Sequence, residues 1–127
     1  MRRSRGRQSY MIYVDVNVLY YYLTAHEEFG ARSKELLEEY SDYLATSALT
    51  AWLLYVLTRL ENVAEILSEL GIRLLPLTSE VLRLAIKMKI PKDFEDRIHL
   101  ATMKQYNIEI ILSNDRDFDL PNVKRIF

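Results

Sequence analysis

Four aspartates stand where apolar segments of the chain begin or end. Asp15 lies inside the apolar run IYVDVNVL, Asp96 leads the striped segment EDRIHLATM, and Asp115 and Asp117 follow the run IEIIL. A buried charge without a partner is strongly destabilising. Carboxylates that meet also repel one another, whereas a bound divalent cation keeps them ionised. The pattern therefore indicates a cation site formed by Asp15, Asp96 and Asp115, provided that the fold brings them together.

Oxygen is the ligand atom that this composition favours. The chain has no cysteine and two isolated histidines, His26 and His99, so it offers neither thiolates nor a histidine cluster for zinc. Carboxylate oxygens suit Mg²⁺ or Mn²⁺, which keep several waters and accept phosphate oxygens. Because such an ion lowers the pKa of bound water and shields a phosphodiester, converging acids would predict metal-dependent nuclease chemistry.

Each acid also has a structural interpretation. Asp93 and Asp96 have the spacing of a helix start, where the helix dipole favours both charges. Asp115 and Asp117 in SNDRD could stabilise turns through their own side chains. Asp15 is harder to explain in this way, because its strand offers the charge no evident partner.

The elements that must position these residues alternate along the chain. Strands are predicted over residues 11–16, 42–47, 72–77, 108–113 and 123–127, the third of them near an edge because Pro76 lacks a donor. Helices are predicted over residues 17–23, 31–40, 48–60, 62–70, 79–89 and 93–106. Their expected caps and stops are Asn17, Ser47, Gly71 and Pro91. This alternation predicts a three-layer α/β/α fold with a central, mostly parallel twisted sheet.

Parallel strands of an open sheet bind ligands beyond their carboxyl ends, where loops and helix N-termini converge. Asp15 ends the first predicted strand, Ser47 the second, and Ser113 and Asp115 the fourth. Asp96 lies in the first turn of a helix that can point to the same edge. We therefore expect carboxylates from distant sequence positions to converge there.

Length and composition predict a single domain over residues 9–127, preceded by a basic tail over residues 1–8. The chain has 127 residues and is 50% hydrophobic, which suffices for one core. Four of its 17 basic residues lie in the tail, so the remainder has 13 basic and 18 acidic residues, a net charge of −5. We expect the tail to be disordered, with a phosphate-binding arm as the alternative.

No membrane partner is expected. The sequence contains no apolar run of about 18 residues and no signal-peptide core after its basic start, so we expect a soluble, cytoplasmic protein. The largely apolar helix over residues 48–60, with Trp52 and Tyr55, would either be buried in the monomer or contact a partner. His99, on a half-buried helix, is interpreted as structural. Arg97 and Arg116, beside the acids, would bind phosphates or form salt bridges.

Taken together, these segments resemble the PIN domain, the nuclease fold that includes the VapC toxins of prokaryotic toxin–antitoxin pairs. The resemblance runs from YVDVNVLYYYL through ATSALTAW and FEDRIHLATMKQYNIEIILSNDRDFD to VKRIF. The family has a strand-end Asp with an Asn two residues on, a helix-start Asp, and a final S/T-x-D-x-D-F pattern. These are matched here by Asp15, Asn17, Asp96, Ser113, Asp115, Asp117 and Phe118.

This resemblance implies Mg²⁺- or Mn²⁺-dependent cleavage of RNA. It implies that Asp15, Asp96 and Asp115 are the catalytic and metal-binding residues, supported by Asn17, Ser113 and Asp117. It also implies a homodimer and, for a toxin, a small protein antitoxin as partner.

One family acid is missing from this chain. A Glu usually follows the TS strand end by six residues, and Leu53 occupies that position. Residues 43–60 contain no Asp or Glu, and Asp42 and Glu61 lie too far away along the chain to substitute.

Glu95 and Asp93 flank the helix-start acid and would compensate only with an unusual local geometry. A missing ligand or supporting group commonly costs about 10–100-fold in metal affinity or activity. The alternative function is therefore a catalytically weakened or inactive PIN module that binds RNA or a protein partner.

Overall fold

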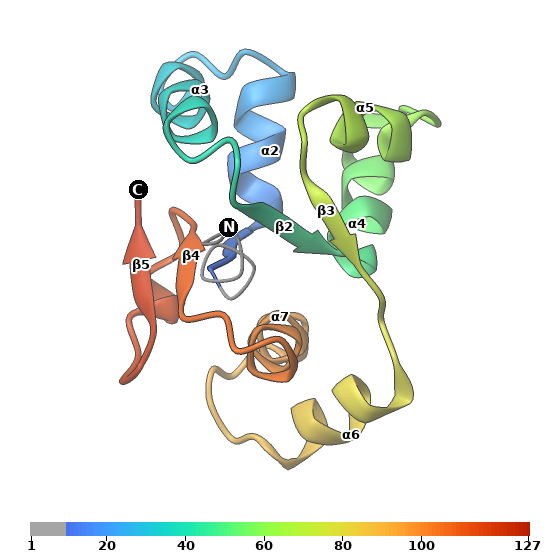
Figure 1. The fold of residues 1–127 in the computed structure, drawn as a ribbon, viewed down its shortest axis with the longest axis vertical. Coiled ribbons are helices and arrows are strands. Elements are labelled where there is room, and N and C mark those ends of the chain that lie inside the picture. The colour runs from blue at the N-terminus through green and yellow to red at the C-terminus, as the bar shows by residue number, and fades with distance from the viewer. Residues whose placement is uncertain (1–9) are drawn as a thin grey trace, which may run out of the picture.

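The structure is a computed structural model and describes residues 10–127, so the predicted basic tail over residues 1–8 lies outside the described residues. Its strands are β1 (Ile12–Val14), β2 (Leu44–Ser47), β3 (Arg73–Leu75), β4 (Ile110–Leu112) and β5 (Lys124–Ile126). Its helices are α2 (Val16–Leu23), α3 (Gly30–Glu39), α4 (Ala48–Thr58), α5 (Val63–Glu69), α6 (Ser79–Lys87), α7 (Phe94–Gln105) and the 3₁₀ helix η1 (Arg116–Phe118). Figure 1 shows these elements along the chain.

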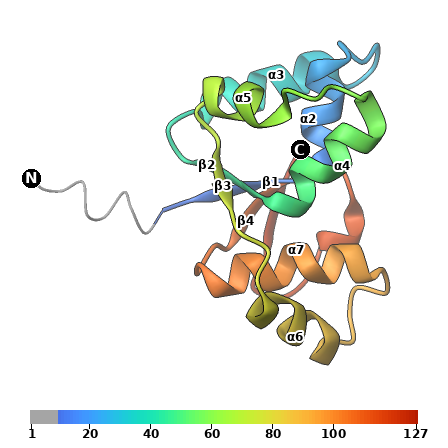
Figure 2. The ribbon, with the colours of Figure 1, turned by 90° about the vertical axis from the view of Figure 1, so that its right-hand side faces the viewer.

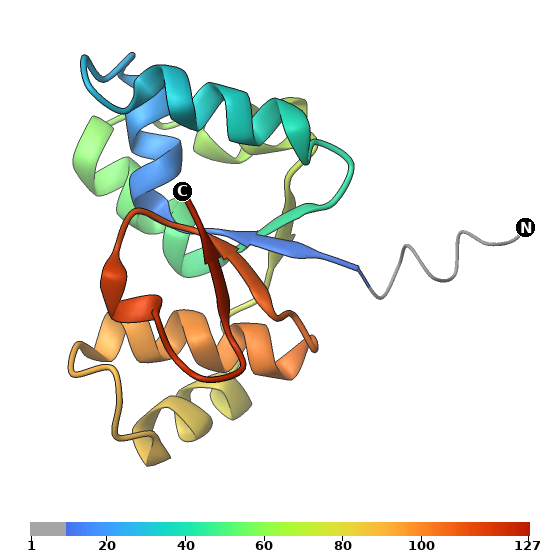
Figure 3. The same cartoon turned by 90° about the vertical axis from the view of Figure 1, so that its left-hand side faces the viewer.

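The five described strands form one parallel sheet in the order β3-β2-β1-β4-β5. Helices α2, α3, α4 and α5 cover one face, and α6 and α7 cover the other, as two perpendicular views show (Figures 2 and 3). The predicted three-layer α/β/α fold is confirmed. The predicted edge position of the third strand is confirmed as well, because β3 ends the sheet.

The central strand β1 is buried on both faces. Ile12 and Val14 belong to the core beneath α2 to α5, whereas Tyr13 packs in the core beneath α7. Because side chains alternate along a strand, Asp15 must emerge on the same side as Tyr13. The alternation thus directs the carboxylate of Asp15 toward α7.

The strands pair in a register that brings their carboxyl ends to one edge. Val14 of β1 lies opposite Leu112 of β4, and Tyr13 lies opposite Ala45 of β2. The backbone N–H of Asp15 continues the ladder and donates to the carbonyl of Leu112 over 3.0 Å. The residues that follow β1 and β4 therefore lie side by side.

One predicted helix cap is wrong. Asp15 rather than Asn17 is the N-cap of α2, since it still has extended dihedral angles and its side chain accepts from the N–H of Val16. The helix begins immediately after the strand, which leaves no place for a later cap. Two other predictions are confirmed: Ser47 caps α4 through the N–H of Thr50, and Gly71 has a left-handed φ of 74°.

Helix α7 is more deeply buried than the predicted stripe implies. The sequence predicts one apolar stripe on this helix, formed by Phe94, Ile98, Ala101 and Gln105. Its end residues Phe94 and Gln105 are exposed, whereas every residue from Ile98 to Met103 is buried. The reason is that α6 packs on the outer side of α7 through Val81 and Ala85. The helix therefore lies between the sheet and a further helix.

Helix α4 is only partly buried in the monomer, and its contact with a partner stays a prediction. Leu54 is fully buried, whereas Trp52 and Leu57 are 59% and 54% exposed. One face therefore belongs to the core, and the other carries apolar side chains on the surface. Over residues 10–127, no helix has both the length and the apolarity that crossing a bilayer requires.

The two faces of α4 allow a direct test of the core. We expect Leu54→Ala to lower the free energy of unfolding by about 2–5 kcal/mol, because it opens a cavity in a closed core. The matched control is Leu57→Ala, which removes the same atoms from the exposed face and should change stability by less than about 1 kcal/mol. Urea unfolding measures both, and equal effects would contradict the packing described.

Candidate functional site

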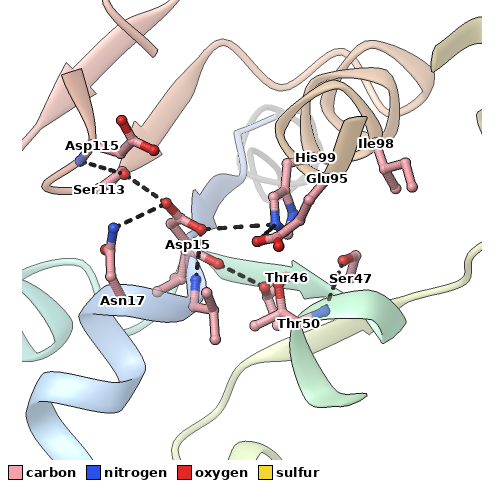
Figure 4. Close-up of polar contacts among 12 residues, drawn as sticks. Asp15, Asn17, Thr46, Ser47, Thr50, Glu95, Ile98, His99, Ser113 and Asp115 are labelled. Atoms are coloured by element: carbon pink, nitrogen blue, oxygen red, sulfur yellow. Dashed lines mark hydrogen bonds and ion pairs between the residues drawn. The ribbon is translucent and has the colours of Figure 1, made fainter. Parts of the chain in front are cut away.

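The carboxylate of Asp15 is buried at the end of β1, with the residue 4% exposed. Oδ1 accepts a hydrogen bond from the backbone N–H of Val16 over 2.7 Å. Oδ2 accepts from the hydroxyl of Ser113 over 2.7 Å and from the amide of Asn17 over 3.2 Å (Figure 4). Three donors from two strand ends therefore fix the orientation of this carboxylate.

The same contacts join the end of β4 to the end of β1. The Ser113 hydroxyl also accepts from the backbone N–H of Asp115 over 3.0 Å. The side-chain oxygen of Asn17 accepts from the backbone N–H of Asn114 over 3.4 Å. Ser113 and Asn17 thus hold the loop that carries Asp115 against β1.

Three other acids form a group that could hold a metal ion. Asp96, Asp115 and Asp117 each offer a carboxylate oxygen, and these oxygens lie within 4.8 Å of one another. Asp96 is buried in the first turn of α7, Asp115 is half-buried, and Asp117 is exposed. Asp115 accepts from the N–H of Asp117 over 2.9 Å, which shapes the turn into η1. The exposure increases toward Asp117, so the group opens to solvent.

Asp15 lies beside this group rather than within it. Its charge nevertheless acts on Asp96, and it is linked to Asp115 through the Ser113 hydroxyl. Of the three acids expected from the sequence to converge, Asp96 and Asp115 therefore lie together and Asp15 lies behind them. Asp117, expected in a supporting position, belongs to the group itself.

The electrostatics of the site disfavour four unpaired negative charges. Burial raises the pKa of Asp96 to about 7, and the charges of Asp115 and Asp15 add to that rise. Burial also raises the pKa of Asp15, with a smaller contribution from Asp115 and an opposing one from His99. A cation at the group would relieve this repulsion, since it stabilises the ionised carboxylates.

The donor set fits Mg²⁺ or Mn²⁺. All the candidate ligand atoms of the group are carboxylate oxygens, which these hard cations prefer. Asp96, Asp115 and Asp117 would hold the ion, and the buried carboxylate of Asp15, whose charge acts on Asp96, would be a further ligand.

A buried pair behind the acids was not foreseen from the sequence. His99 is fully buried, and its Nδ1 lies 2.6 Å from the hydroxyl of Tyr13. Its Nε2 lies 3.8 Å from Asp15 Oδ1 and 3.6 Å from Glu95 Oε2, and the neighbouring imidazole lowers the pKa of Glu95. Two signals were available in the sequence: Tyr13 shares a strand face with Asp15, and Glu95 is spaced four residues from His99.

The arginines next to the acids have different environments. Arg97 donates to the carbonyls of Met88 and Lys92 over 2.9 and 3.2 Å, so it fastens the connection between α6 and α7. Neither of the expected roles, a phosphate contact or a salt bridge to the acids, describes these contacts. Arg116 is exposed on η1, next to Asp115 and Asp117.

Comparison with known proteins places this fold and site in a family. The family model of the PIN domain matches residues 12–123 of the sequence, which is most of the chain. The chain therefore belongs to the PIN-domain family. No curated protein sequence gives a match.

Several solved structures share the fold. Mycobacterium tuberculosis VapC20, a sarcin–ricin loop cleaving toxin, aligns with a TM-score of 0.73 at 18% identity over 85% of this chain and 92% of its own. A toxin–antitoxin complex from Klebsiella pneumoniae aligns with a TM-score of 0.69 at 18% identity over 88% of this chain and 94% of that chain. FitAcB from Neisseria gonorrhoeae aligns with a TM-score of 0.66 at 21% identity over 92% of this chain and 97% of that chain.

The raised pKa values predict an unusual pH dependence of the metal-free protein. A carboxyl group whose pKa is raised in the folded state keeps its proton at pH values where the unfolded chain has lost it. The free energy of unfolding therefore falls as the pH rises from about 4, the ordinary pKa of an aspartate, to about 7, the pKa of folded Asp96. We therefore expect the wild type in EDTA to be less stable to urea at pH 8 than at pH 5.

Asp96→Asn provides the matched comparison for this effect, because it keeps the shape and removes the charge. The variant should be more stable than the wild type at both pH values and by a larger margin at pH 8, because the unfolded chain has already ionised at pH 5 whereas folded Asp96 ionises only near pH 7. Wild-type and Asp96→Asn unfolding curves that shift equally between pH 5 and pH 8 would contradict the assigned electrostatics.

Proposed function

We propose that this chain is a Mg²⁺- or Mn²⁺-dependent endoribonuclease and the toxin of a toxin–antitoxin pair that acts in the cytoplasm. The observation that carries the proposal is the group formed by Asp96, Asp115 and Asp117, whose carboxylate oxygens lie within 4.8 Å of one another at the carboxyl edge of the sheet. Ligands of open parallel α/β sheets bind at this edge. Membership of the PIN family and the toxins that share the fold support the same conclusion.

The residues of the site have two proposed roles: some bind the metal ion, and others orient its carboxylate ligands. Asp15, Asp96 and Asp115 are the proposed catalytic, metal-binding residues, with Asp117 completing the group on the solvent side. Ser113 and Asn17 fix Asp15 through the contacts described above. An ion held by these carboxylates would lower the pKa of a bound water and shield the phosphodiester.

The exposed side of α4 supports a protein partner. Trp52, Val56 and Leu57 of α4, and Leu60 shortly after its end, are each at least 39% exposed. Apolar side chains gathered on a surface are typical of interaction sites. We propose that this side of α4 contacts a small protein antitoxin or a second copy of the chain, as the toxin–antitoxin complex from Klebsiella pneumoniae makes plausible for a related fold.

A second candidate function follows from the absence of an acid on α4. Residues 43–60 contain no Asp or Glu, and Leu53 is half-buried at the position where the family usually has a Glu. With fewer carboxylates, the site would bind a cation less tightly. A PIN module that binds RNA or a protein partner without cleaving it is the resulting alternative.

Cleavage of RNA by the purified protein tests the proposed function. We expect wild-type protein with Mn²⁺ to cleave mixed RNAs, EDTA to stop the reaction, and Asp96→Asn to slow it by about 100-fold or more, because a ligand is lost rather than an outer contact. The matched control is Asp42→Asn, which removes an exposed acid at the opposite end of β2 and should leave the rate unchanged.

Three outcomes distinguish the candidates. Cleavage that persists in Asp96→Asn would remove this site from the reaction. RNA binding without cleavage by the wild type would favour the binding module. A thermal midpoint that Mn²⁺ does not raise would leave only a structural role for the acids, because a ligand bound by the folded state must stabilise it.

A further inference from the structure

Helix α7 directs a second acidic side chain toward the site. Glu95 lies in the first turn of α7, one residue before Asp96. Its Oε2 lies 3.6 Å from Nε2 of His99, which in turn lies 3.8 Å from Oδ1 of Asp15. Figure 4 shows the carboxylate of Glu95 beside the His99 ring, on the side that faces Asp15. The Glu95 side chain is 45% exposed, so it contacts the buried pair and solvent at once.

The ring of His99 has an unpaired nitrogen at this point. His99 is fully buried, and its Nε2 has no hydrogen-bond partner among the described residues. Such groups are rare in folded proteins, where buried polar atoms are almost always paired. Nε2 is aimed between two carboxylates, from different elements, and each is slightly beyond hydrogen-bond distance.

We propose that Glu95 is a further carboxylate of the cation site, beside Asp15, and that the Tyr13–His99 pair is a positioning pair for it. The inference rests on the proposed function, because it assigns a further residue to the same metal centre. It concerns this chain in particular, since the opposite wall, α4, has no acid to offer.

Consecutive residues of a helix point in different directions, about 100° apart. Asp96 therefore joins Asp115 and Asp117 on one side of the site, whereas Glu95 projects from α7 toward Asp15. Two neighbouring acids thus approach the centre from two sides.

A simple ion pair on a helix surface does not explain this arrangement. Pairs spaced four residues apart on an exposed helix surface contribute little in water. His99 is instead fully enclosed and faces Asp15 as well as Glu95. The imidazole of His99 therefore lies between the buried carboxylate of Asp15 and the half-exposed carboxylate of Glu95.

Tyr13 fixes the ring that makes this link. With two carboxylates facing Nε2, the ring hydrogen belongs on Nε2, and the Tyr13 hydroxyl donates to Nδ1 over the observed 2.6 Å. The Tyr13 hydroxyl thus sets which nitrogen can donate to the acids. Outer contacts of this kind orient ligands in metal sites and influence affinity.

Binding of Mn²⁺ alone, without RNA, tests the role of Glu95. Titration calorimetry and the Mn²⁺-dependent rise of the thermal midpoint should show about 10–100-fold weaker binding by Glu95→Gln than by the wild type. The metal-free midpoint should be nearly unchanged, because the side chain is half-exposed. The matched control is Glu65→Gln, which changes an acid in the first turn of α5, on the other face of the sheet, and should bind Mn²⁺ like the wild type.

Tyr13→Phe tests the positioning pair. It should also weaken Mn²⁺ binding, and its effect should be smaller in the Glu95→Gln background than in the wild type, because the two residues act through one contact. Independent effects of equal size in the two backgrounds would overturn the positioning role.

The remaining outcomes separate this inference from the proposed function. If the wild type binds Mn²⁺ and Asp96→Asn does not, equal binding by Glu95→Gln and the wild type overturns the role of Glu95 alone. If the wild type fails to bind Mn²⁺, or Asp96→Asn binds it equally well, both the metal centre and the role of Glu95 are overturned.

Discussion

The structure depends on one buried carboxylate at the end of its central strand. Asp15 is enclosed where the sheet, α2 and α7 meet, so its charge must be satisfied by whatever surrounds it. The donors come from the start of α2 and from Ser113 at the end of β4. Satisfying Asp15 therefore fixes the strand register, the start of a helix and the loop that carries Asp115. The architecture of the site follows from this requirement.

Much of the fold could be predicted from the sequence because the signals are local. Strands of alternating or continuous apolar residues, Ser47 as a cap and Gly71 with a positive φ all depend on a few neighbouring residues. The predictions that are wrong concern positions where tertiary packing, rather than the neighbouring sequence, determines the structure. Asp15 caps α2 because strand and helix meet without a linker, and α7 is buried almost all round because α6 covers it.

The site was harder to predict than the fold. Strand ends and the helix start placed the acids at one edge, and Asp96 and Asp115 do lie together. Which acid is innermost depends on the side-chain direction and the loop shape, so Asp117 enters the group and Asp15 lies behind it. The Tyr13–His99 contact joins residues 86 positions apart, and no sequence spacing encodes such a contact.

The hydrogen bond between Ser113 and Asp15 also determines when, during synthesis of the chain, the acidic site can form. It joins residues 98 positions apart, and β1 depends on β4 for one of its two neighbours. Contacts of such separation form late, because most of the chain must be available before they can close. A polypeptide still being synthesised on the ribosome therefore lacks the strand that completes the acidic edge. We expect the acids to assemble only after β4 and Ser113 have left the ribosome.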